Sequence, residues 1–216
     1  MRDSFHFDKI ESSTAGRSLV KRRCGQRVTM DEFGYLSVLL SIILGLAITQ
    51  ILKGFRGILQ SRDRVRLYWP ALAWAVLLLV VYVQTWWAMF GLRSHHDWTF
   101  GAFAIVLLQT IVLYMLAGLV LPDFFGDRPV NLRANYYAHH SWFFGLAVLA
   151  GFVSIAKDLV LDGGLPELRN LAFHIAFIAT AVVAAITRRE WYHKVAVLVT
   201  ACLFGFYVAL LFARLR

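Results

Sequence analysis

Three histidines form the candidate set for binding a metal ion or haem. His174 falls about one turn inside an apolar stretch, whereas His95 and His96 occupy a connection between two such stretches. Neutral imidazole is the commonest metal-binding side chain and a usual axial ligand of haem iron. No HExxH or CxxC pattern accompanies these residues. The sequence therefore predicts no cofactor as the leading interpretation, and a haem- or metal-binding redox protein is the alternative.

Uncharged polar side chains recur inside the first three apolar stretches. Gln50, Gln84 and Gln109 lie on successive stretches, and Thr49 adjoins the first of them. Lipid offers no hydrogen-bond partner to an amide or a hydroxyl group, so each must find one within the protein. The structural interpretation is that these groups form hydrogen bonds between helices. The functional interpretation is a polar pocket that holds a small neutral ligand or a lipid headgroup.

One pair of opposite charges, Lys157 and Asp158, ends the fourth apolar stretch. Neighbouring residues of a helix point about 100° apart, so the two need not contact each other. We expect a lysine that extends to the membrane interface and a solvated carboxylate. The alternative is that Asp158 faces His174 on the next stretch.

The connection after the first apolar stretch is strongly basic. The net charge of the chain is +9, but the basic residues lie between apolar stretches, which favours anionic lipid headgroups over nucleic acid as their partner. The predicted headgroup-binding residues are Lys53, Arg56, Arg62, Arg64 and Arg66.

Long apolar blocks dominate the chain and indicate its fold class. Of its 216 residues, 59% are hydrophobic, and the mean hydropathy is +0.63. An apolar helix of about twenty residues crosses the roughly 30 Å hydrocarbon core of a bilayer. The prediction is an all-α, polytopic transmembrane bundle. Its six expected spans are residues 33–57, 67–92, 98–121, 140–161, 169–187 and 193–214.

Residues 1–30 differ from the remainder of the chain, because they are polar, mixed in charge and without periodicity. We expect a disordered extension, or a translation start at Met30 instead. The position of the start affects the predicted orientation of the chain in the membrane. Basic residues concentrate in the connections after spans one, three and five, which predicts that these connections face the cytoplasm and that both ends face outward. A basic extension at residues 1–30 conflicts with that orientation, whereas a start at Met30 agrees with it.

Small residues recur at every fourth position of three spans, for example at Ser41, Gly45 and Thr49 of the first. This spacing places them on one helix face and lets two backbones approach closely in lipid. The leading interpretation is packing within the chain. A homo-oligomer seam, or contact with a partner membrane protein, is the alternative.

The apolar run from Phe33 to Gln50, followed by the segment SRDRVRLYWP at residues 61–70, resembles a family of uncharacterised bacterial multi-pass integral membrane proteins. The resemblance implies a bacterial cytoplasmic (inner) membrane and implies nothing about catalysis. We therefore expect a non-enzymatic membrane component, either an accessory subunit or a permease-like protein that binds a small solute or lipid. The rival expectation is a redox protein that uses His174 with His95 or His96.

Overall fold

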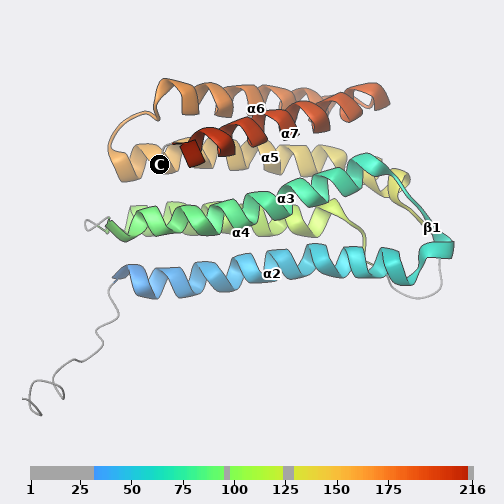
Figure 1. The fold of residues 1–216 in the computed structure, drawn as a ribbon, viewed down its shortest axis with the longest axis horizontal. Helices are drawn as coiled ribbons and strands as arrows, with labels where there is room; N and C mark the ends of the chain where they lie inside the picture. The colour runs from blue at the N-terminus through green and yellow to red at the C-terminus, as the bar shows by residue number, and fades with distance from the viewer. Residues whose placement is uncertain (1–31, 95–97, 124–128, 214–216) are drawn as a thin grey trace, which may run out of the picture. The chain divides into compact units, whose positions relative to one another are not determined.

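Six long helices make up most of the protein in the computed structural model, which describes residues 32–94, 98–123 and 129–213 (Figure 1). The helices are α2 (Glu32–Gln60), α3 (Trp69–Ala88), α4 (Phe100–Val120), α5 (Leu132–Asp162), α6 (Leu168–Ile186) and α7 (Glu190–Ala213). Short elements link them: η1 (Arg62–Arg64), β1 (Val65–Arg66), η2 (Met89–Ser94) and β2 (Val130–Asn131). All six long helices are long and apolar enough to cross a membrane. The prediction of an all-α, multi-pass membrane protein is confirmed at this level.

Local sequence signals explain where several helices begin and end. The Thr99 hydroxyl accepts a hydrogen bond from the Ala102 N–H at 3.1 Å and caps α4. Asn131 Oδ1 accepts from the Arg133 and Ala134 N–H groups and caps α5. Gly163 ends α5 with a φ of 67°, a backbone conformation that glycine adopts without a Cβ clash. Pro70 stands in the first turn of α3, where its missing N–H costs nothing.

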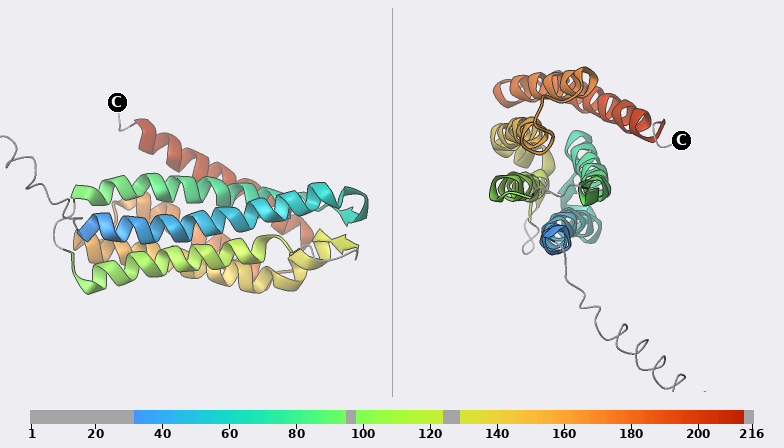
Figure 2. Two further views of the ribbon diagram at one scale, coloured as in Figure 1. Left: turned by 90° about the horizontal axis from the view of Figure 1, so that it is seen from below. Right: turned by 90° about the vertical axis from the view of Figure 1, so that its left-hand side faces the viewer.

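Within residues 36–213, α5 is the central helix. It packs against α4 on one side and α6 on the other, while α7 contacts both α6 and α3 (Figure 2). Helix α2 lies at the edge of this arrangement and turns one face inward. That face has buried residues at three- and four-residue intervals, as expected of one stripe of a helix. Its members are Leu36, Leu40, Leu44, Ala47 and Ile51.

Three of the five connections between the long helices gather at one end of the bundle. Strand β1 pairs in parallel with β2, with Val65 opposite Val130, so the connections after α2 and α4 meet. The connection between α6 and α7 joins them, because Arg133 at the start of α5 forms a 2.8 Å ion pair with Glu190 at the start of α7. The basic connections that the sequence assigns to one face of the membrane therefore share one end of the bundle.

Helix α5 differs from the predicted fourth span, residues 140–161. It begins at Leu132, so residues 132–139, which the predicted spans leave in a connection, are helical. The Asn131 cap and a buried stripe at Leu132, Tyr136 and His140 explain the earlier start, because the helical period extends back to the cap. The predicted extension at residues 1–30 lies outside the described residues.

The small-residue stripe of α2 does not pack within the chain, which corrects the leading interpretation for that helix. Ser41, Gly45 and Thr49 are exposed, and a Cβ atom at Gly45 would meet nothing within 4 Å. Close approach occurs elsewhere. A Cβ at Gly54 would lie 2.7 Å from Leu121 Cδ1, and one at Gly151 would lie 2.6 Å from Ile178 Cγ1. The glycines that matter for packing are thus decided by which face each helix turns inward.

Candidate functional site: an amphipathic cavity between five helices

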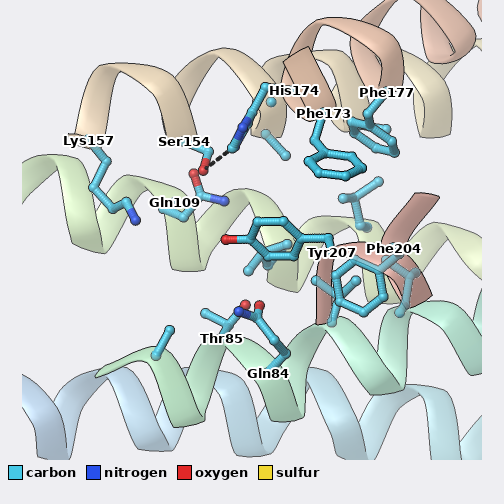
Figure 3. Close-up of a pocket in the computed structure, with 18 of the residues that line it drawn as sticks. Gln84, Thr85, Gln109, Ser154, Lys157, Phe173, His174, Phe177, Phe204 and Tyr207 are labelled. Carbon is cyan, nitrogen blue, oxygen red and sulfur yellow. Dashed lines mark hydrogen bonds between the residues drawn. The ribbon is translucent and has the colours of Figure 1, made fainter. Parts of the chain in front are cut away.

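A cavity of about 360 Å³ lies between α3, α4, α5, α6 and α7 (Figure 3). This volume falls within the range of small-molecule sites, which are concave, mostly apolar and few per protein. Much of the wall is apolar and aromatic. Its larger side chains include Trp74, Leu113, Phe143, Phe173, Phe177 and Phe204.

Polar side chains gather on the wall of the same cavity. Most of them come late in α3, α5 and α7 or early in α4 and α6, which places them toward the end of the bundle opposite β1 and β2. The polar residues that line the cavity are Gln84, Thr85, Gln109, Thr110, Ser154, Lys157, Asp158, Asn170, His174, Thr200 and Tyr207. Figure 3 shows Gln84, Gln109 and Tyr207 extending into the shared space. The cavity therefore has an apolar part and a polar part.

His174 is held by a hydrogen bond at each ring nitrogen. Its Nδ1 lies 2.8 Å from the Asn170 carbonyl oxygen, which can only accept, so Nδ1 carries the proton. Its Nε2 lies 3.0 Å from Ser154 Oγ, as the dashed line in Figure 3 marks. In the neutral imidazole, Nε2 accepts the Ser154 hydroxyl proton. Helices α5 and α6 are thereby joined by a polar contact inside the cavity.

Lys157 and Asp158 contact each other, contrary to the expectation of two separately solvated groups. Lys157 Nζ lies 3.1 Å from Asp158 Oδ1, and both side chains are mostly covered. Asn170 Nδ2 donates to Asp158 Oδ2 at 3.3 Å. Both side chains line the cavity, where pairing avoids the cost of a partly desolvated, unpaired charge. Asp158 does not contact His174 directly; Asn170, which bonds to each of them, lies between the two.

Several polar atoms on this wall have no hydrogen-bond partner among the described residues. They are Gln109 Oε1, Asn170 Oδ1 and Thr200 Oγ1. Thr200 is 7% exposed. A buried polar atom without a partner costs about 1–3 kcal/mol. These three residues line the cavity, but the atoms themselves are covered by neighbouring atoms.

The structure brings together two of the three glutamines that the sequence singled out. Gln84 and Gln109 line the cavity, but Gln50 and Thr49 do not. The inward face of α2 explains the difference. At 100° per residue, Thr49 lies about 180° and Gln50 about 80° from the centre of the buried stripe. Thr49 Oγ1 donates instead to the Gly45 carbonyl oxygen at 2.8 Å. The predicted pocket is thus corrected to exclude the first span.

Only one of the three predicted metal- or haem-binding histidines is among the described residues. His174 belongs to the cavity, whereas His95 and His96 lie outside the described residues. Among residues 32–94, 98–123 and 129–213, no group of three or more His, Cys, Asp or Glu side chains could hold a metal ion. Ligation through His174 Nε2 would require breaking the contact with Ser154.

A second polar cluster lies at the opposite end of the bundle. His193 is fully buried; its Nε2 donates to the Thr187 carbonyl oxygen at 2.9 Å, and its Nδ1 lies 3.0 Å from Tyr136 Oη. His140 is also buried, and its ring centroid lies 5.8 Å from that of His193. Because His193 Nε2 donates, Nδ1 accepts the Tyr136 hydroxyl proton in the neutral ring. These contacts join α5 to α7. Burial in the same region raises the pKa of the nearby Tyr68 side chain.

The predicted headgroup-binding residues lie at this same end and point outward. Lys53, Arg56, Arg62, Arg64 and Arg66 are all exposed. Exposed tryptophans accompany them, with Trp69 at 45% and Trp191 at 61% exposure. Trp86 and Trp87 are exposed at the other end of α3. Two such groups suit the two interfaces of a bilayer.

Sequence reasoning did not single out Ser154, Asn170, Thr200 or Trp74 as members of the site. A helical-spacing signal for the first two was available. Ser154 stands three and four residues before Lys157 and Asp158, and Asn170 stands four before His174, so each set shares one helix face. What the spacing does not reveal is that these two faces turn toward each other and toward Gln84 and Gln109.

Comparison with known proteins adds no further identification: no family model, no curated protein and no solved structure matches this chain.

Proposed function

We propose that this chain is a multi-pass protein of a bacterial cytoplasmic membrane that binds a small amphipathic molecule in the cavity between α3 and α7. The observation that carries the proposal is the two-part lining of the cavity, in which apolar and aromatic side chains adjoin a group of polar side chains. The proposed role is that of a binding component, either permease-like or an accessory subunit, which is the role expected from the sequence.

The two-part lining supports an amphipathic ligand rather than an inorganic ion or a wholly apolar molecule. Phe143, Phe173 and Phe177 offer an apolar surface to a short chain or ring. Ser154, Asn170 and Gln109 offer donors and acceptors to a polar head. Sites for small molecules commonly combine a mainly hydrophobic lining with a few placed polar groups that fix orientation.

The indole of Trp74 supplies a direct readout of occupancy. It lines the cavity and is 5% exposed. We would reconstitute the protein in lipid nanodiscs and add 1-octanoylglycerol, octanoate or octylamine. The Trp74 signal is the fluorescence of the native protein minus that of Trp74→Phe, because the chain has seven tryptophans. We expect saturable change with at least one of the three probes.

A pair of matched variants distinguishes the cavity from the lipid-facing surface. Ala147→Trp fills the cavity, since Ala147 is buried on its wall. Ala88→Trp narrows the cavity from an exposed position and carries less risk of misfolding. Ala172→Trp adds the same ring on the exposed face of α6, away from the cavity lining. Binding should be lost in the first two and retained in the third. Absence of saturable binding by all three probes in the native protein would overturn the proposal.

A further inference from the structure

We propose that the polar head of the bound molecule carries no net charge, as is true of a hydroxyl-bearing or amide-bearing head. This inference rests on the proposed function, because it specifies the ligand class of the same cavity.

The charge balance of the wall is the first support. Lys157 is the basic side chain and Asp158 the acidic side chain that line the cavity. Their charges balance in an ion pair, with 3.1 Å between Lys157 Nζ and Asp158 Oδ1. Both ring nitrogens of His174 are already engaged, by Ser154 and by the Asn170 carbonyl oxygen. A ligand with a net charge would therefore be buried without a free counter-charge, which is strongly unfavourable in a mostly apolar site.

The Asn170 amide is the second support. Its Nδ2 donates to Asp158 Oδ2 at 3.3 Å. The Asp158 carboxylate is thus held by an uncharged amide as well as by Lys157, and it needs no cationic group from the bound molecule.

The uncharged polar side chains of the wall can supply hydrogen bonds to such a head. Gln84, Gln109 and Tyr207 extend into the shared space (Figure 3), and an amide or a phenol group can both donate and accept. A diol or a primary amide can exchange hydrogen bonds with them without bringing a net charge into the cavity.

Three probes with the same eight-carbon chain length test the charge requirement. They are 1-octanoylglycerol, which is an uncharged diol, octanoate, which is an anion, and octylamine, which is a cation near neutral pH. We expect 1-octanoylglycerol to bind at least about tenfold more tightly than either charged probe, measured by the Trp74 difference fluorescence in nanodiscs. Equal or tighter binding of octanoate or octylamine would overturn this inference and leave the proposed function standing. Binding of none would overturn both.

Variants of the ion pair test the charge requirement by leaving one unpaired charge in the cavity. Lys157→Met leaves Asp158 unpaired, and the preference should shift toward octylamine. Asp158→Asn leaves Lys157 unpaired, and the preference should shift toward octanoate. Asn170→Ala should weaken 1-octanoylglycerol binding about tenfold, whereas Ser41→Ala, on the exposed face of α2, should leave it unchanged. A ranking of the three probes that is the same in both charge variants as in the native protein would contradict the inference.

Discussion

At the scale of single residues, the protein is organised by polar groups that find partners on other helices. Ser154 meets His174 across α5 and α6, and Tyr136 meets His193 across α5 and α7. Each contact supplies a hydrogen bond that the lipid around the helices cannot offer. Loss of one partner should therefore cost the desolvation of the other, not only the bond itself.

Tyr136→Phe removes the hydroxyl that donates to His193 Nδ1 and leaves a fully buried ring nitrogen without a partner. We expect the free energy of unfolding to fall by about 1–3 kcal/mol. Urea or dodecyl sulfate unfolding in detergent micelles, followed by circular dichroism, measures the change. Tyr114→Phe, at a residue that is 36% exposed, is the control and should be near neutral. Equal stability of the two variants would show that the Tyr136 contact is not stabilising.

Ser154→Ala makes the corresponding change at the cavity. It leaves His174 Nε2 without its 3.0 Å partner. We expect a loss of stability of about 1–3 kcal/mol in the empty protein, measured by the same unfolding method. Ser41→Ala is the matched control. If the two serines gave the same small effect, the Ser154–His174 contact would have to be absent in the membrane.

At the scale of elements, glycine marks the place where α5 and α6 come closest. A Cβ at Gly151 would lie 2.6 Å from Ile178 Cγ1, whereas a Cβ at Gly145 of the same helix would meet nothing within 4 Å. Van der Waals packing of this kind is a principal source of helix association in lipid. The position of a glycine on the helix, rather than its presence, determines its role.

Gly151→Ala should therefore push α5 and α6 apart and lower the unfolding free energy by about 1–3 kcal/mol. Gly145→Ala should be neutral or stabilise by up to about 1 kcal/mol, because alanine has the higher helix propensity. Thermal denaturation of the two variants, prepared in the same detergent, gives the comparison. Gly151→Ala that is as stable as Gly145→Ala would contradict the close packing.

At the scale of the whole molecule, the connections divide between two ends of the bundle. Residues 61–68, the start of α5 and the connection between α6 and α7 share the basic end. The polar part of the cavity lies toward the other end. With basic connections on the cytoplasmic side, we expect the polar part of the cavity to lie nearer the outer face.

Cysteine labelling tests this orientation in a background where Cys24 and Cys202 are replaced by serine. Ser61→Cys should react with a membrane-impermeant maleimide only after the cells are opened. Gly164→Cys, in the connection between α5 and α6, should react in intact cells. Mass shifts of the protein on a gel measure both. The reverse pattern would place the basic end outside and overturn the orientation.

The sequence alone determined that the protein is a bundle of six apolar helices and approximately where each one lies. Length and apolar composition suffice for this, because a bilayer requires a long apolar helix whatever its neighbours are. The sequence also shows that basic residues concentrate in alternate connections, and this predicts which connections face the cytoplasm. Residue spacing also places Ser154, Lys157 and Asp158 on one face of α5.

Only the tertiary structure decided which faces turn inward. Thr49 and Gln50 carry the same chemistry as Thr85 and Gln84, yet the first pair lies off the cavity and the second pair lines it. In lipid the outward face of a helix is as apolar as the inward face, so hydropathy does not distinguish the two. The difference is set by packing across helices, as where Gly151 admits Ile178 or Asn170 reaches Asp158. Those contacts join residues distant in the chain, and no local pattern records them.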